Sequence, residues 1–212
     1  VEYGIYTNKD YGNVRGLELK LDYSFNNLFI QTNYTYQFTR GNADNPAQTF
    51  NRQGASIDEV IRFIPMSWDQ RHTFNLSLGY NTALYGITAT GYYNSGTPYT
   101  FSPQGESNLA LLNLYPNNDY KPSSYYADLS GYINLPKVFG VSSRLDILIY
   151  NLTDRYNEYG VSSETGRSYT AVVNETELLS HRSNFNTYED RYKDPSMFSA
   201  PRQIKLGLTI LF

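Results

Sequence analysis

The last eleven residues of the chain, 202–212, alternate between apolar and polar side chains almost without a break and finish on an aromatic residue. Every even position from Ile204 to Phe212 is apolar, and the odd positions up to Thr209 are polar or glycine, with Leu211 as the exception. Because successive side chains of a β-strand point to opposite faces, this segment predicts a strand with one continuously apolar face. Terminal residues of soluble domains are usually frayed and polar, so the pattern is typical of a strand that crosses an outer membrane.

Six further segments show the same two-residue period. They span residues 13–24, 28–40, 71–80, 85–93, 125–135 and 141–152, and residues 1–6 resemble the end of one more strand. The apolar sides of the strands include Leu19, Ile30, Leu76, Ile147 and Leu208. Strands of soluble proteins average roughly 5 to 6 residues, about half the length of these segments. At ~3.3 Å per residue and a tilt of ~45°, about ten to twelve residues rise roughly 23 to 28 Å, which matches the ~25 Å apolar band of a membrane barrel.

The connections between these segments alternate in length. The short ones cover residues 25–27, 81–84 and 136–140, and the long ones, rich in Asn, Ser, Pro and Gly, cover 41–70, 97–124 and 158–200. Outer-membrane barrels have this asymmetry, with short periplasmic turns and longer extracellular loops. The sequence therefore predicts an all-β fold: a transmembrane antiparallel β-barrel segment of about seven to eight strands with long extracellular loops, and with Phe212 at the periplasmic rim.

The composition fits a membrane barrel and excludes several other classes of protein. The mean hydropathy is -0.52, and no stretch approaches the ~20 apolar residues of a spanning helix, whereas polar lumen-facing residues lower the hydropathy of barrel strands. The 22 tyrosines and 11 phenylalanines suit β-structure and the aromatic girdles of a barrel. With 17 basic against 20 acidic residues the chain lacks the basic excess of a nucleic-acid binder, and the absence of cysteine excludes disulfides and thiolate metal sites.

The strand number and the first residues both indicate an incomplete barrel. Bacterial barrels have an even number of strands, and an open sheet would leave unpaired backbone groups in lipid. The chain opens at Val1 directly into strand-like sequence, without a signal peptide or an initiating methionine. We therefore expect residues 1–212 to be a fragment whose amino-terminal part lies elsewhere.

Several short motifs occur in order along the chain. They are Trp68–His72, Ser95–Thr100, Tyr150–Asn157, Thr165–Arg167, Asp194–Arg202, and Leu206–Leu208 followed by Phe212. In order and spacing these motifs resemble the carboxyl-terminal third of the barrel of TonB-dependent outer-membrane receptors. The resemblance implies a barrel of about 22 strands that is plugged by an amino-terminal domain and imports a scarce nutrient with energy passed on by TonB. Residues 1–212 would then be the carboxyl-terminal portion, with the plug and the first strands absent.

The resemblance also implies a place and a set of partners. The place is the bacterial outer membrane, and the partners are the lipid bilayer, the rest of the barrel and its plug, the TonB complex through that plug, the barrel-assembly machinery and a possible surface lipoprotein. Two other readings remain open. A passive porin or a structural outer-membrane subunit would share every strand feature. A secreted carbohydrate-binding β-sandwich would explain the alternation, but not the strand length, the loop asymmetry or Phe212.

The sequence contains no recognisable catalytic or metal-binding arrangement. His72 is expected at a strand rim, and His181 stands alone in a long loop. No serine lies in a Gly-x-Ser-x-Gly context, and the acidic pair Asp58–Glu59 and the mixed charges of residues 188–194 lack the spacing of a calcium loop. We therefore expect no enzyme activity, no cofactor and no resident metal.

Three groups of residues are candidates for function. Aromatic residues in the long loops either stack against a sugar or an apolar ligand, or pack the loops together: Phe50, Phe63, Tyr99, Phe101, Tyr115 and Tyr120. Charged residues are expected to face the lumen, paired with one another and the plug or in contact with substrate: Glu18, Lys20, Asp22, Arg144, Asp146 and Lys205. The stripe of Leu208, Ile210 and Phe212 resembles the signal that the barrel-assembly machinery reads in this family.

Overall fold

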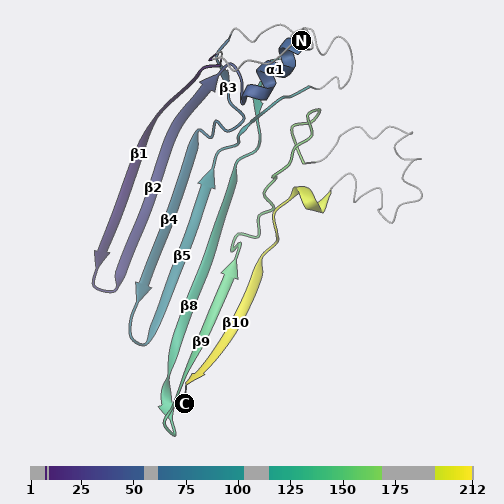
Figure 1. Cartoon of the computed structure of the whole chain (residues 1–212). Coiled ribbons are helices and arrows are strands. Elements are labelled where there is room, and N and C mark those ends of the chain that lie inside the picture. The colour runs from purple at the N-terminus through teal and green to yellow at the C-terminus, as the bar shows by residue number, and fades with distance from the viewer. Residues whose placement is uncertain (1–7, 9, 55–61, 103–114, 169–193, 212) are drawn as a thin grey trace, which may run out of the picture.

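The chain folds into one long-stranded antiparallel sheet with its connections gathered at one end (Figure 1). The computed structural model describes residues 8, 10–54, 62–102, 115–168 and 194–211. The sheet consists of β1 Gly12–Phe25, β2 Leu28–Gly41, β3 Ile64–Pro65, β4 His72–Asn81, β5 Tyr85–Asn94, β8 Ser124–Val138, β9 Val141–Tyr150 and β10 Gln203–Leu211. The long strands lie in the order β1-β2-β4-β5-β8-β9-β10, and the short β3 pairs with β2. All of these pairs are antiparallel.

The seven strands expected from the alternation are confirmed, and the long connections contain elements that it did not predict. These elements are the helix α1 Pro46–Gly54, the two-stranded ribbon of β6 Pro98–Tyr99 and β7 Asp119–Tyr120, and the 3₁₀ turn η1 Pro195–Met197. Two predicted strand ends were wrong. β9 stops at Tyr150 because Asn151 adopts a left-handed backbone with a φ of 53°, and β8 runs on to Val138, so that the turn after it is shorter than predicted.

The strand register aligns side chains of one kind across the whole sheet. One row of directly paired residues is apolar from edge to edge: Tyr23, Ile30, Leu78, Ala89, Leu129, Ile149 and Ile204. The adjacent row on the other face is polar: Asp22, Gln31, Ser77, Thr90 and Asp128. Since directly opposite residues project to the same side, the sheet has one apolar face and one polar face.

Neither face of the sheet is covered by another layer in the part of the chain that the structure describes (Figure 1). Among these residues the only buried hydrophobic side chains are Ile64 and Met66, and both belong to the loop end. Large hydrophobic side chains of the apolar face are exposed instead, and Leu206 in β10 is 79% exposed. The described fold therefore lacks the hydrophobic core that stabilises a soluble domain.

The two ends of the sheet differ as the sequence predicts. At the turn end the strands are joined by Asn26–Asn27, by 82–84 and by Phe139–Gly140. Phe139 and Gly140 both have positive φ, as in a type I′ hairpin turn, whose twist matches that of the flanking strands. The long connections with α1, the β6–β7 ribbon and η1 lie at the opposite, loop end (Figure 1). β10 finishes at the turn end, where Ile210 pairs with Ser143.

Candidate functional site

The apolar face is the largest feature of the molecule that needs a partner. Leu19, Ile30, Leu76, Ile147 and Leu208, which the sequence assigns to the lipid side, all project from this face. Thr32 is a polar exception between Leu21 and Leu76, and its hydroxyl donates to the carbonyl of Asn75 at 2.9 Å. The one polar group in this central area is therefore satisfied within the sheet and needs no water.

Aromatic side chains mark both ends of the apolar face. Those at the loop end are Tyr34, Tyr36, Phe74, Tyr93 and Tyr125, and those at the turn end are Tyr23, Phe25, Tyr80 and Tyr85. His72 joins the loop-end group, because its Nδ1 lies 2.9 Å from the hydroxyl of Tyr34 and its ring lies 5.0 Å from that of Tyr36. This rim position agrees with the prediction for His72. Two aromatic bands with an aliphatic zone between them are the arrangement of the interfacial girdles of membrane barrels.

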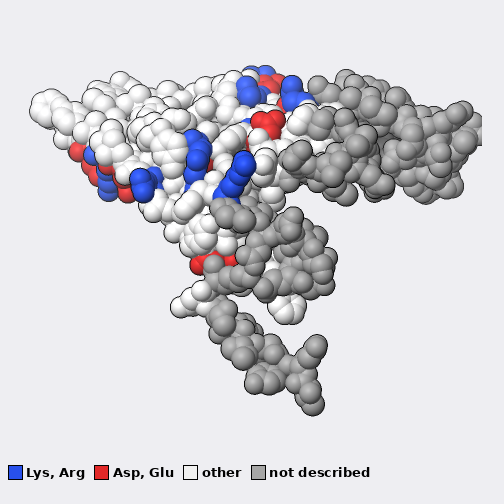
Figure 2. Space-filling view, turned by 90° about the horizontal axis from the view of Figure 1, so that it is seen from above, with Lys and Arg blue, Asp and Glu red and all other residues white. Residues whose placement is uncertain are grey.

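The polar face carries all six charged residues predicted for the lumen. Lys20 lies 3.0 Å from Asp22, and Arg144 lies 2.7 Å from Asp146. The other two charges also have partners within the sheet: Glu18 accepts a 2.8 Å hydrogen bond from Asn33, and Lys205 lies 5.0 Å above the ring of Tyr150. Seen from the loop end, the part of the sheet at the left carries acidic and basic side chains along one side and is white along the other (Figure 2).

A group of three tyrosines lies at the loop end of the polar face and was missed by the sequence reasoning. The rings of Tyr92 and Tyr126 are 4.9 Å apart, and the hydroxyl of Tyr126 hydrogen-bonds that of Tyr159. Burial, followed by the hydrogen bond shared with Tyr126, raises the pKa of Tyr159. The available signal was that Tyr92 and Tyr126 fall on the polar side of the alternation, where an aromatic ring is out of pattern.

The first long connection is anchored to the rim by the carboxylate of Asp69, which is completely buried. This carboxylate accepts hydrogen bonds from the backbone N–H of Thr39 at 2.6 Å, from Nε of Arg71 at 2.8 Å and from the hydroxyl of Tyr120 at 3.0 Å. The guanidinium of Arg71 also lies 4.2 Å from the ring centre of Phe38. The Trp68–His72 motif thus ties β2, β4 and the β6–β7 ribbon together.

A second polar contact joins the first two long connections. The side-chain amide of Asn117 donates to the carbonyl of Pro65 at 2.9 Å and to the carboxylate of Asp44 at 3.2 Å. Asp44 in turn accepts from the backbone N–H of Ser67 at 2.7 Å. These connections are therefore held to one another by hydrogen bonds that centre on Asn117 and Asp44.

Residues of the motif Tyr150–Asn157 connect the ends of β8, β9 and β10 through hydrogen bonds. The amide of Asn151 donates to the carbonyls of Arg155 at 2.9 Å and Ala200 at 3.0 Å. Asn157 is fully buried, and its side chain exchanges two hydrogen bonds with the backbone of Tyr125, at 3.1 Å and 2.9 Å. Asparagine suits both positions, because its side-chain amide donates through nitrogen and accepts through oxygen at the same time.

The third long connection carries an ion pair between Glu158 and Arg167. Nε of Arg167 lies 3.0 Å from both carboxylate oxygens of Glu158, and the backbone N–H of Ser168 donates to the same carboxylate at 2.8 Å. The hydrogen bonds from Arg167 hold the pKa of Glu158 below its usual value, although burial opposes the shift and the Ser168 backbone supports it.

The lowered pKa predicts that acid loosens this connection. A carboxylate with a depressed pKa in the folded state contributes stability above its unfolded pKa of about 4.3 and loses that contribution as the pH falls through the folded value. Hydrogen exchange of the Ser168 amide, corrected for intrinsic rates, is expected to be constant from neutral pH to about pH 5 and to accelerate below about pH 4. The variant Glu158→Gln should lack this acid step. An identical pH response in both proteins would contradict the assignment.

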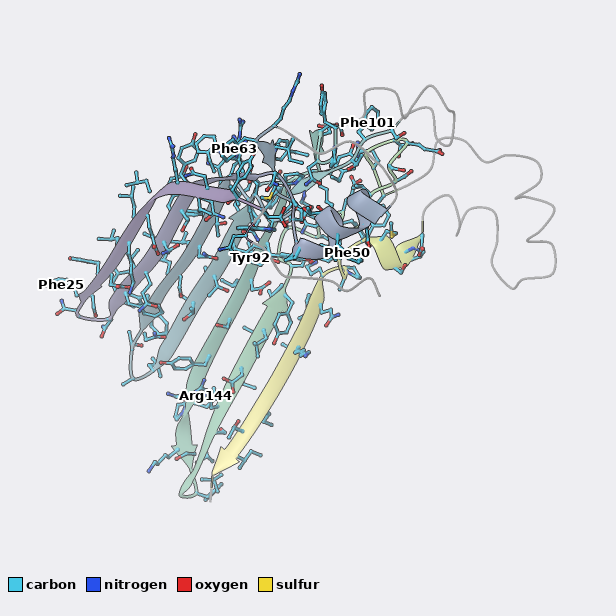
Figure 3. All side chains as sticks on the ribbon, turned by 45° about the horizontal axis from the view of Figure 1, so that its top comes forward. Phe25, Phe50, Phe63, Tyr92, Phe101 and Arg144 are labelled. Atoms are coloured by element: carbon cyan, nitrogen blue, oxygen red, sulfur yellow. The ribbon has the colours of Figure 1, made fainter. Side chains whose placement is uncertain are left out.

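The loop aromatics do not converge on one place. Phe50 is 71% exposed, Phe63 lies 4.9 Å from the ring of Tyr11, and Tyr115 lies beneath the guanidinium of Arg62 at 4.9 Å. Figure 3 shows Phe50, Phe63 and Phe101 at separate places above the loop end of the sheet.

The remaining loop aromatics mostly pack against the loops. The rings of Tyr99 and Phe101 are 6.4 Å apart. Tyr120 is hydrogen-bonded to both Asp69 and Arg71. Loop packing therefore explains Tyr99, Phe101 and Tyr120 better than stacking against a ligand does.

Some candidates lie outside the described residues, namely Phe212, His181, Asp58–Glu59, residues 188–193 and the strand end at residues 1–6. Within the described ranges, no three His, Asp or Glu side chains gather as a metal ion would require. No helix in the same ranges is long and apolar enough to cross a membrane.

No family model, curated protein or solved structure matches the chain. The sheet and its two faces are therefore the observations on which a functional proposal must rest.

Proposed function

We propose that this chain is a segment of an outer-membrane β-barrel, and that it forms the carboxyl-terminal strands and loops of a TonB-dependent nutrient receptor. The observation that carries the proposal is the apolar face, which runs across seven strands in register and includes many exposed large hydrophobic side chains. Fully burying a leucine-sized side chain is worth about 1.5 to 3 kcal/mol. An apolar surface of this extent therefore has to be shielded from water. Lipid acyl chains can shield it without a complementary fixed shape.

The form of the sheet supports a barrel rather than a sandwich. A β-sandwich covers its apolar face with a second sheet, and the described residues contain only the small β6–β7 ribbon besides the main sheet. Among the described strands, β1 and β10 each pair on one side only, and unpaired backbone groups in lipid cost several kcal/mol each. Additional strands must therefore complete the sheet, as the resemblance implies for a barrel of about 22 strands.

Two features favour a receptor over a passive porin. The motif residues Asp69, Asn151 and Asn157 are buried at the loop end, where they hold the long connections in defined positions. The polar face combines paired charges with the tyrosines at positions 92, 126 and 159, which gives a surface able to contact a plug and a substrate. A porin or a structural subunit would share the two faces, but neither explains the order and spacing of the motifs.

The proposal assigns partners to particular surfaces. The apolar face contacts lipid, the polar face contacts the plug, and TonB acts through that plug. The free edge of β10 offers backbone hydrogen bonds for strand addition by the barrel-assembly machinery, with Leu208 and Ile210 supplying side-chain specificity. Phe212 belongs to the same proposed signal.

The proposal is tested with the complete protein that contains this segment. A barrel is expected to require detergent for extraction and to migrate faster on an electrophoresis gel before boiling than after it. Uptake of the receptor's nutrient by whole cells should then be lost when TonB is deleted and when the proton gradient is dissipated. Uptake that survives both treatments would leave the barrel but overturn the receptor, and extraction without detergent would overturn the barrel itself.

Orientation gives a separate prediction. Cysteines at Asn26 and Lys137, at the turn end, are expected to escape a membrane-impermeant thiol label on intact cells, while cysteines at Asn45 and Asn118, at the loop end, are expected to react. The reason is that short turns of such barrels are periplasmic and long loops are extracellular. All four sites should react after the cells are lysed, which controls for local burial. The reverse pattern on intact cells would overturn the topology.

A further inference from the structure

A groove of about 700 Å³ lies on the apolar face at the loop end of β1 and β2. Its lining combines cationic, aromatic and aliphatic side chains: Arg15, Arg40, Leu17, Tyr36, Phe38 and Phe63. Phe63 lies above the loop end of these strands (Figure 3). The groove lies where the aliphatic zone of the apolar face gives way to polar residues.

Two arginines stand next to each other in this groove. Arg15 pairs directly with Phe38 and Arg40 pairs directly with Asn13, so the two arginines are diagonal neighbours on one face, with Cα atoms about 7 to 8 Å apart. Both are exposed, and Nε of Arg15 donates to the side chain of Asn13 at 2.8 Å. At that spacing two long, flexible guanidinium groups can reach one anion.

Neither arginine has a carboxylate partner among the described residues. Other arginines at the loop end do: Arg71 pairs with Asp69, Arg167 with Glu158, and Arg202 with Asp154. On the apolar face, the loop-end residues of the neighbouring strands β4, β5 and β8 are His72, Tyr93 and Tyr125, which lie in the rows of Leu17 and Leu19. Among the paired strand residues of this face at the loop end, Arg15 and Arg40 are therefore the two arginines without a carboxylate partner.

Along the strands, the lining of the groove changes from aliphatic to aromatic to cationic side chains. This is the order of the acyl chain, the interface and the charged headgroup of a lipid. Leu19 and Leu17 come first, then the rings of Tyr36 and Phe38, and finally the two guanidinium groups. Aliphatic side chains suit acyl chains, aromatic rings suit the interface, and guanidinium binds phosphate through paired hydrogen bonds.

We propose that this groove binds the phosphorylated headgroup of an anionic glycolipid of the outer leaflet, with an acyl chain lying along Leu17 and Leu19. The proposal rests on the membrane placement of the proposed function. A soluble phosphate compound would leave the apolar part of the groove without a partner, which is why a membrane lipid is the better occupant.

The test uses the complete barrel purified in an uncharged detergent, with diphosphorylated lipid A as the probe and native mass spectrometry as the readout. Wild-type protein is expected to retain the lipid, and the double variant Arg15→Gln, Arg40→Gln should retain it about 25-fold less well. This figure follows from ~1 kcal/mol, or about fivefold, per basic residue at an anionic membrane surface. Dephosphorylated lipid A should bind both proteins equally weakly.

A matched control removes two positive charges from the other face. The double variant Lys20→Gln, Lys205→Gln changes the net charge equally and is expected to keep the wild-type lipid affinity. Equal retention by the Arg15–Arg40 variant and wild type would overturn the proposal, as would an equal loss in the control. Displacement of the lipid by an equal concentration of inorganic phosphate would also overturn it. If the barrel does not form, boiling does not change the migration of the protein on an electrophoresis gel. This result would count against the proposed function, whereas a folded barrel that does not retain the lipid would count against the lipid site alone.

Discussion

In the proposed barrel, replacing Leu76 by arginine is expected to remove most of the folded protein, whereas replacing its neighbour Asn75 by arginine is expected to leave the barrel folded. Leu76 lies mid-strand in β4 on the apolar face, paired with Thr32 and Gly91, while Asn75 lies on the polar face, paired with Asn33 and Tyr92. A charge at the midplane of a lipid-facing surface costs about 2 to 4 kcal/mol, against little on the lumen side.

These two variants control for each other. Both introduce the same positively charged side chain at consecutive positions of one strand, so their unfolded chains are nearly equivalent. The measurement is the fraction of protein that shows heat-modifiable migration after refolding into phospholipid vesicles, followed by urea unfolding of what has folded. Equal losses in both variants would show that the two faces have been assigned wrongly.

Replacing Asp69 by alanine is expected to detach the first long connection from the rim while the barrel itself stays folded. The change leaves the N–H of Thr39 and the guanidinium of Arg71 without their buried partner. Removing one member of a buried ion pair typically costs about 3 to 5 kcal/mol. The Thr39 amide should therefore exchange with solvent roughly 150-fold to 5,000-fold faster.

Asp119 supplies the control for this variant. It lies next to Tyr120 on the same ribbon, but it is exposed, and it accepts only a 3.3 Å hydrogen bond from Tyr99 and one from the backbone of Tyr120. The variant Asp119→Ala is expected to change the exchange of Thr39 by less than about fivefold, because exposed polar contacts contribute about 0 to 1 kcal/mol. Protection of Thr39 that survives the loss of Asp69 would refute the anchoring role.

The alternation predicts the sheet because the order of apolar and polar residues within each strand shows which side chains belong to which face. Leu17 to Asp22 and Ile204 to Thr209 can be assigned to sides from local sequence alone, and the register then brings like sides together. Strand ends are less predictable, since Asn151 leaves β9 through a left-handed backbone that several polar residues also tolerate. The helix α1 has too few apolar residues for a helical period, although the Asn45–Pro46 start, in which the Asn45 side chain accepts from the N–H of Gln48 at 3.1 Å, was a usable signal.

The clusters at the loop end could not be predicted in the same way. Asp69 and Tyr120 are 51 residues apart and Asn157 and Tyr125 are 32 apart, so their contacts depend on how three long connections fold over the rim. The Arg15–Arg40 pair is different, because both arginines interrupt the apolar side of their own strands. A residue that breaks an otherwise regular alternation is therefore a better sign of a site than its chemical type alone.

No packed layer covers the apolar face of the described sheet, and this affects which of its residues can be exchanged during evolution. In a globular protein the hydrophobic positions vary slowly, because each must fit the shape of its packed neighbours. A side chain such as Leu206 or Leu208, which is exposed on this sheet, would meet only fluid acyl chains, so any residue of sufficient hydrophobicity serves there. The strictest geometric demands fall instead on small polar residues such as Asn151 and Asn157. In the proposed barrel we expect the hydrophobic positions to vary among Leu, Ile, Val and Phe, and the hydrogen-bonding residues of the rim to keep their identity.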